Sequence, residues 1–270
     1  MDPTHGASFS VPEATTDEAP LLSLHGVQKA YGRGARSTPV LHGIDLEVRA
    51  GASLGIVGES GAGKSTILSL LMGLSAPTAG TVRFRGRELR RARAGRMRDF
   101  RRTVQLVFQD PRSSLDPRMS VGRILREPLE SLGIPGAHGE RVGELLEAVG
   151  LEPGMAARYP GEFSGGQRQR IAIARALAPD PEVLVADEPV SALDVSVRAQ
   201  IVELLGRLKT ERGMTLVMVS HDIAIVGQLC EETVILHDGR VVERGRSLDV
   251  LTAPRDAYTR RLLAAVPQLP

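Results

Sequence analysis

The sequence has one cysteine and no tryptophan, and aromatic residues make up only 3% of its 270 positions. A single thiol, Cys230, excludes a disulfide framework and a cysteine-rich zinc or iron–sulfur site, and it suits a reducing compartment. The scarcity of aromatic side chains disfavours a base-stacking surface, so we expect no nucleic acid among the partners. The chain also lacks a run of about 18 apolar residues and the basic-then-apolar layout of a secretory signal. We therefore expect that it does not cross a membrane by itself.

Excess charge of one sign is small, because the formal net charge is only +2. The exception is the stretch 83–102, which holds ten arginines against two acidic residues. Such a stretch could bind nucleic acid or anionic lipid, but a solvated helix with outward arginines is favoured because aromatic residues hardly interrupt it. The hydrophobic content of 42% allows a buried core. Residues 1–20 are rich in Pro, Thr, Ser, Ala and acids and predict a disordered tail, which leaves residues 21–270 as the folded part.

A glycine-rich loop between an apolar run and a helical pattern matches the phosphate cradle Gly-x-x-x-x-Gly-Lys-Ser. The run Leu54–Val57 predicts a buried strand, and apolar residues at 67, 68, 70, 71 and 74 fall at helical spacing. Glycines let backbone N–H groups turn toward an anion, the helix N-terminus adds a positive dipole, and lysine supplies a full charge. The alternative is a plain strand-to-helix turn with an exposed lysine. The candidate ATP-binding residues here are Gly58, Glu59, Ser60, Gly61, Ala62, Gly63, Lys64, Ser65 and Thr66, with the Ser65 hydroxyl also a candidate Mg²⁺ ligand.

Two carboxylates follow a second apolar run. Val183–Ala186 suits a strand buried on both faces, and Asp187 and Glu188 come directly after it. We expect Asp187 to bind Mg²⁺ and Glu188 to orient and deprotonate the attacking water. On their own, two acids at a strand end could equally cap the next helix.

A third motif stands between these two and opens a helix. Ser164, Gly165, Gly166 and Gln167 precede a pattern with apolar residues at 171, 172, 176 and 177. A serine and two glycine amides at a helix N-terminus form a second place where negative charge is stabilised. The alternative is that the glycines serve only as a turn into the helix.

In this order the three motifs resemble those of the nucleotide-binding subunits of ABC transporters, from about residue 21 to residue 267. The resemblance implies ATP sandwiched between two such chains, with the serine motif of one meeting the γ-phosphate held by the other. It also assigns four further positions, each of which alone could be an ordinary surface or capping residue. They are Tyr31 stacking on adenine, Gln109 as nucleotide and Mg²⁺ contact, Asp194 in Ser191–Asp194 facing the nucleotide, and His221 touching the γ-phosphate.

The resemblance implies an α/β fold: a P-loop NTPase (RecA-like) core of mainly parallel sheet, with an antiparallel β subdomain and an inserted helical subdomain at 111–180. The residue patterns agree with this architecture. Alternation at 44–48 predicts a half-buried antiparallel strand paired with 22–24, and prolines at 117, 128, 135, 153 and 160 divide a helical region. Residues 197–208 predict a helix, 215–219 a buried strand, and Asp238-Gly239 a two-residue hairpin turn.

Within that family the chain is most similar to the peptide/nickel importer branch. Residues 108–119, 163–175 and 187–196 carry this similarity. The chain departs from the branch at Asp256-Ala-Tyr-Thr259, where the branch has His-Pro-Tyr-Thr, and it lacks a cysteine-rich extension. The resemblance implies ATP and Mg²⁺ as cofactors, a second ATPase subunit forming a hetero- or homodimer, integral permeases, an indirect solute-binding partner, and a peripheral place on the cytoplasmic face of the membrane. Peptide, nickel or metallophore cargo stays open, as does a soluble ATPase of a phosphonate-degradation complex.

Overall fold

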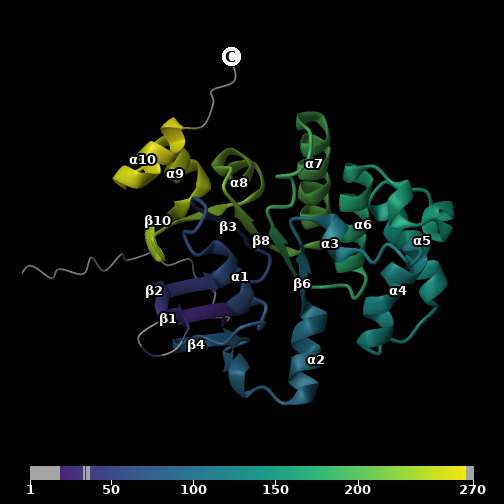
Figure 1. Ribbon diagram of the computed structural model, residues 1–270, viewed down its shortest axis with the longest axis horizontal. Helices are drawn as coiled ribbons and strands as arrows, with labels where there is room; N and C mark the ends of the chain where they lie inside the picture. The colour runs from purple at the N-terminus through teal and green to yellow at the C-terminus, as the bar shows by residue number, and fades with distance from the viewer. Residues whose placement is uncertain (1–18, 33, 35–36, 266–270) are drawn as a thin grey trace, which may run out of the picture.

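The computed structural model describes residues 19–32, 34 and 37–265. Most of the predicted tail at 1–20 therefore lies outside the described residues. Two sheets and the helices around them make up the fold (Figure 1). Among the described residues, no helix combines the length and the apolarity needed to cross a membrane.

The central sheet has six strands in the order β10-β9-β3-β8-β7-β6, and all neighbouring pairs except β10–β9 are parallel. The predicted strands at 54–57, 183–186 and 215–219 are confirmed, each buried throughout its apolar run. Strands covered on both faces read as continuous apolar segments, which is why periodicity could find them. The bounds are β3 Ser53–Val57, β6 Val104–Val107, β7 Val183–Asp187, β8 Thr215–Ser220, β9 Glu232–His237 and β10 Arg240–Arg246.

Two apolar cores lie on opposite faces of this sheet. Along β7, Val183 and Val185 join the core that contains α1, whereas Leu184 and Ala186 join the core that contains α6 and α7. Because successive strand residues face opposite sides, one strand serves both cores. Gly55 of β3 is required where α8 packs, since a Cβ there would stand 2.0 Å from the Val226 Cγ1. The covering helices are α1 Lys64–Leu71, α7 Val195–Arg212, α8 Ile223–Leu229, α9 Ser247–Thr252 and α10 Ala257–Ala264.

The antiparallel sheet packs beside α1 and has the order β2-β1-β4-β5. As predicted, residues 22–24 pair with 46–48, and Ile44, Leu46 and Val48 are buried. The bounds are β1 Leu22–Tyr31, β2 Thr38–Val48, β4 Ala79–Phe84 and β5 Arg87–Glu88.

Helices occupy the chain between β6 and β7 and lie together at one end of the molecule (Figure 1). The expectation that Pro128 divides this region is wrong, because Pro128 lies inside α4. Pro153 and Pro160 instead begin short 3-10 helices, where the missing N–H is not needed. The bounds are α3 Pro111–Ser114, α4 Val121–Ser131, α5 His138–Ala148, η3 Pro153–Ala157, η4 Pro160–Glu162 and α6 Gly165–Leu177.

The helix predicted for the arginine-rich stretch 83–102 is right only for its second half, α2 Ala94–Thr103. The first half completes β4, turns at Arg85-Gly86 with positive φ angles of 49° and 71°, and continues through β5 and η2 Leu89–Arg91. The two halves are held together by an edge-to-face contact between Phe84 and Phe100, whose ring centroids are 5.3 Å apart. Buried aromatics in an otherwise polar stretch decided its structure.

Leu74 was placed on the helix after the phosphate loop, and that prediction is also wrong. The helix ends at Leu71, Gly73 adopts a left-handed φ of 63°, and the N–H of Leu74 donates to the Ser69 carbonyl at 2.9 Å. This is a glycine-terminated Schellman end, which directs the next residue away from the helix axis. Leu74 is consequently 71% exposed.

Candidate functional site

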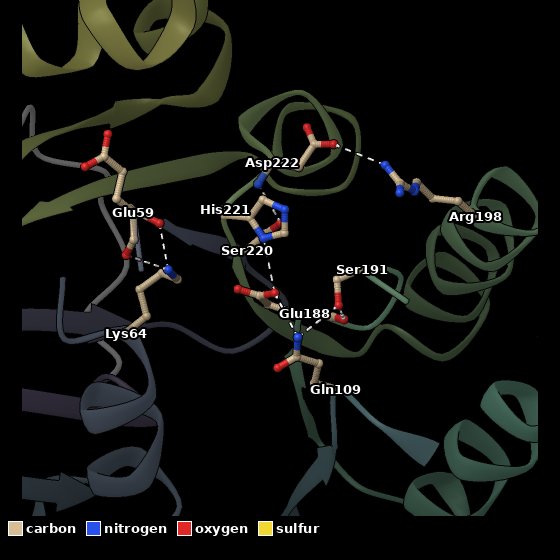
Figure 2. Close-up of polar contacts among 10 residues, drawn as sticks. Glu59, Lys64, Gln109, Glu188, Ser191, Arg198, Ser220, His221 and Asp222 are labelled. Atoms are coloured by element: carbon tan, nitrogen blue, oxygen red, sulfur yellow. Dashed lines mark hydrogen bonds and ion pairs between the residues drawn. The ribbon is translucent and has the colours of Figure 1, made fainter. Parts of the chain in front are cut away.

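The candidate site lies where the parallel strands β3, β7 and β8 end. The phosphate loop follows β3, the two carboxylates end or follow β7, and His221 follows β8. In open parallel sheets, ligands bind outside the carboxyl ends of the strands. Figure 2 shows Lys64, Glu188, Gln109 and His221 pointing toward this common space from four segments of the chain.

The loop needs glycine at three places for two physical reasons. Gly61 and Gly63 have φ angles of 85° and 105°, a region that side chains with a Cβ rarely occupy. At Gly58, a Cβ would stand 2.4 Å from the Leu236 carbonyl oxygen of β9. The loop is therefore pressed against its neighbouring strand, with its backbone turned as an anion cradle requires.

Lys64 is the first residue of α1 and is only 7% exposed. Its Nζ donates to the carbonyl oxygens of Gly58 at 2.6 Å and Glu59 at 2.9 Å. Burial lowers the pKa of Lys64, and the nearby carboxylates of Glu188 and Asp187 act in the opposite direction. The ammonium is thus held inside the loop by oxygen atoms, which the oxygens of a phosphate could replace.

Asp187 is the last residue of β7, and burial together with the charge of Glu188 raises its pKa. A desolvated carboxylate beside a second carboxylate is unfavourable without a cation, and Lys64 compensates it only in part. Ser65, the second residue of α1, is exposed and has an oxygen of the hard type that Mg²⁺ prefers. The donor set therefore fits a divalent cation.

Glu188 has a backbone conformation that non-glycine residues seldom adopt, with φ at 42°. Its N–H donates to the Val219 carbonyl at 2.8 Å, which ties the residue to the end of β8. Its carboxylate Oε2 accepts from Gln109 Nε2 at 3.2 Å and meets His221 Nδ1 at 3.1 Å. Backbone strain of this kind concentrates at functional positions.

Gln109 follows β6 and bridges two neighbours, since its Nε2 also reaches the Ser191 Oγ at 3.2 Å. That hydroxyl in turn donates to the Glu188 carbonyl at 3.1 Å. Ser191 was noticed only as the first residue of its motif, and its hydrogen bonds were not predicted. It links the motif around Asp194 to the candidate catalytic carboxylate.

His221 is positioned by the residue after it. The Asp222 carboxylate accepts the Ala224 N–H at 3.0 Å and so caps α8. The backbone N–H of Asp222 donates to the Ser220 Oγ at 2.9 Å. Arg198 of α7 lies 3.7 Å from the other Asp222 oxygen (Figure 2). Sequence analysis missed Asp222, although an aspartate before an apolar helical run is a recognisable N-cap signal.

The serine motif forms a capping box at the start of α6. The Gln167 N–H donates to Ser164 Oγ at 3.2 Å, and the Ser164 N–H donates to Gln167 Oε1 at 3.0 Å. Gly166 packs so closely on α7 that a Cβ would stand 2.4 Å from Val197 Cγ1. In Figure 1, α6 lies on the other side of the sheet's end from α1, so one chain does not bring this motif onto its own phosphate loop.

The two remaining candidates are exposed. Tyr31 ends β1, with Lys29 Nζ 5.0 Å from its ring centroid and the rest of the ring partly open. Asp194 stands at the N-cap of α7, and its side chain makes no capping hydrogen bond. Neither lies among the hydrogen-bonded residues around Glu188, so both stay predictions that need a nucleotide or a partner to test.

Comparison with known proteins gives a consistent result. A profile of the ABC transporter family matches residues 41–191. A Brucella ovis protein named "Putative peptide import ATP-binding protein" is 45% identical over 252 residues, covering 93% of this chain and 80% of that one. The oligopeptide transport ATP-binding protein OppD of Mycobacterium tuberculosis is 45% identical over 266 residues, covering 95% of this chain but 44% of OppD.

Solved structures agree with these relatives. The ATP-binding cassette MJ0796, in a dimeric post-hydrolysis state bound to ADP and Pi, superposes with a TM-score of 0.75 at 32% identity, covering 84% of this chain and 98% of that one. A family profile over more than half the chain, and a relative matched over most of both lengths, settle the assignment. The chain belongs to the ABC transporter family and is one of its ATP-binding proteins.

Proposed function

We propose that this chain hydrolyses ATP at the interface of a cassette dimer and thereby drives peptide uptake through separate membrane permeases. The observation that carries the proposal is the convergence of Gln109 and His221 on the carboxylate of Glu188, at the sheet end that also bears the phosphate loop. The names of the Brucella and Mycobacterium relatives support peptide as the cargo.

The loop amides and Lys64 hold the phosphates of ATP. The Lys64 ammonium leaves the carbonyls of Gly58 and Glu59 and turns to phosphate oxygens. Asp187, Ser65 and Gln109 hold Mg²⁺, which when bound neutralises charge on the transferring phosphoryl group. The unfavourable burial of Asp187 in the free protein supports this assignment, because a cation removes it.

Glu188 accepts the proton of the attacking water, and His221 holds the γ-phosphate side of the site. The contacts of Glu188 Oε2 with His221 Nδ1 and Gln109 Nε2 fix the position of the carboxylate. Most of the catalysis in such a site is positioning and electrostatics, with proton transfer contributing about 10² to 10⁴-fold.

The second subunit completes the site with its own copy of residues 164–167. In the capping box, Ser164 Oγ accepts a hydrogen bond, so its hydroxyl hydrogen remains able to donate to a phosphate oxygen across the interface. The start of α6 adds backbone N–H groups and the positive end of the helix dipole. The dimeric structure of MJ0796 supports this arrangement. Asp194 and Tyr31 complete the nucleotide contacts.

The groove between α2, β6, α4 and α6 is the proposed docking site for a permease. It has a volume of about 370 Å³, and Leu74 and Phe108 stand exposed at its wall. Such apolar exposure beside arginine and glutamate side chains is typical of a partner surface. A permease bound there would place the chain on the cytoplasmic face of the membrane, with a solute-binding protein acting from the far side.

The experiment compares Glu188→Gln with wild type in the complete complex with both permeases. We expect ATP affinity to stay within about twofold while turnover falls by about 10² to 10⁴-fold, because only the base is lost. Glu203→Gln, the same change on an exposed position of α7, is the matched control and should hydrolyse ATP normally. Peptide uptake into vesicles should fall in parallel with turnover. Near-normal hydrolysis by Glu188→Gln would remove this carboxylate from its role.

A further inference from the structure

The C-terminal segment reaches the phosphate loop through one side chain. Tyr258 of α10 is 5% exposed, and its Oη accepts a hydrogen bond from the Glu59 N–H at 3.2 Å. The two residues are 199 positions apart in the chain. Tyr258 has no role in the proposed function.

The ring of Tyr258 packs on the end of β9, and the hairpin turn after β9 also contacts the phosphate loop. The ring stacks on His237, the last residue of β9, with centroids 3.8 Å apart and planes inclined by 20°. The hairpin turn that follows donates its Gly239 N–H to the Ala62 carbonyl at 3.1 Å. Tyr258 and the hairpin turn therefore contact the phosphate loop at two points, Glu59 and Ala62.

The start of α10 is fixed to the sheet, so Tyr258 is not a loose side chain. The Asp256 carboxylate accepts the N–H of Tyr258 itself at 2.7 Å as the helix N-cap. Glu243 of β10 accepts the N–H groups of Arg255 at 2.8 Å and Asp256 at 3.1 Å. Because these hydrogen bonds fix the backbone at the start of α10, the Tyr258 hydroxyl is a well-positioned acceptor for the Glu59 N–H.

The peptide groups of Glu59 are held from two sides. The Glu59 N–H donates to the Tyr258 hydroxyl, and the Glu59 carbonyl accepts from Lys64 Nζ at 2.9 Å and from the Ala62 N–H at 3.2 Å. If Lys64 turns to ATP, as the proposed function requires, the carbonyl keeps the Ala62 N–H at 3.2 Å, a hydrogen bond within the loop itself. The phenol of Tyr258 then still ties Glu59 to a part of the chain outside the loop. We infer that Tyr258 is a positioning residue that keeps the phosphate loop in its nucleotide-binding shape while Lys64 is engaged with phosphate.

The test is Tyr258→Phe in the full chain, because this change removes the hydroxyl and keeps the stacked ring. Binding of a fluorescent ATP analogue with Mg²⁺ should weaken by about threefold to tenfold, the range that one neutral hydrogen bond accounts for. The melting temperature should stay within about 2 °C of wild type. Amide hydrogen exchange should become faster at residues 59–63 and stay unchanged in α10.

Tyr159→Phe is the matched control, since it makes the same change on a half-exposed tyrosine of another region and should behave as wild type. Unchanged affinity together with unchanged loop exchange in Tyr258→Phe would overturn the inference. A large fall in melting temperature with faster exchange in α10 would also overturn it, because the hydroxyl would then serve general packing. If wild type itself failed to bind the analogue, the proposed function would fail, and the exchange measurement would still decide the role of Tyr258.

Discussion

Replacing Gly166 with alanine should destabilise the protein although alanine is the better helix former. The added Cβ would stand 2.4 Å from Val197 Cγ1, well inside contact distance. Valine in a helix has one strongly preferred rotamer, so the side chain cannot simply turn away. Overpacking of this kind costs about 1 to 3 kcal/mol, and the gain in helix propensity returns about 0.5 to 1 kcal/mol. We expect a net loss of roughly 1 kcal/mol, and at most about 2.5 kcal/mol, in the free energy of unfolding.

The neighbouring glycine provides the control for this prediction. At Gly165 a Cβ would lie 3.7 Å from Leu193 Cδ2, an ordinary contact, so Gly165→Ala should be neutral or slightly stabilising. Adding Val197→Ala to Gly166→Ala should restore most of the loss and give a coupling energy above about 0.5 kcal/mol in a double-mutant cycle. Urea unfolding at equilibrium measures all four variants. If Gly166→Ala proved as stable as Gly165→Ala, the packing argument for the serine motif would be refuted.

Two further substitutions test the site, and one labelling experiment tests the packing of α8. Asp187→Asn should raise the melting temperature of the nucleotide-free chain at neutral pH, because burial raises the pKa of this carboxyl and its ionisation therefore opposes folding. The gain in melting temperature should vanish at a pH below 3.8, the ordinary pKa of the carboxyl, where it is protonated in both the folded and the unfolded chain. An equal gain at that pH would contradict the assignment. Lys64→Ala should abolish measurable ATP binding in an equilibrium assay, and retained affinity would dismiss the phosphate loop. Cys230 is buried, and burial raises the pKa of its thiol to about 12. Iodoacetamide should therefore label this thiol at pH 8 only after the protein is unfolded in urea. Rapid labelling of the native protein would show that α8 opens.

The core of the fold was predictable because its signals are local. The strands β3, β7 and β8 are continuous apolar runs. The predicted hairpin turn at Asp238-Gly239 is confirmed, with positive φ angles of 44° and 69° at its two residues. The failure in the arginine-rich stretch came where distant packing overrode the local pattern. Phe84 and Phe100 pair across the arginine-rich stretch and divide it into strand and helix. No spacing rule relates two such residues, so an arginine-rich pattern looks like one solvated helix.

The same distinction separates the parts of the site. Lys64, Asp187 and Glu188 follow strands in one parallel sheet, so topology alone brings them to one edge, and motif spacing was enough to name them. The strained φ of 42° at Glu188 had no signal in the sequence, and it occurs together with a hydrogen bond from the Glu188 N–H to Val219 on the next strand of the sheet. Ser191 and Asp222 carried weak signals, as the start of a motif and as a helix cap.

The contact between Tyr258 and Glu59 carried no sequence signal at all, and this follows from how the loop is built. An anion cradle must turn its N–H groups toward the ligand, so its outer surface has to be held by other parts of the chain. Here β9 presses on Gly58, Gly239 donates to Ala62, and Tyr258 accepts from Glu59. These supports come from the last quarter of the chain, whereas the cradle comes from the first. We therefore expect that a substitution in the C-terminal segment can alter ATP affinity while every residue of the phosphate loop stays the same.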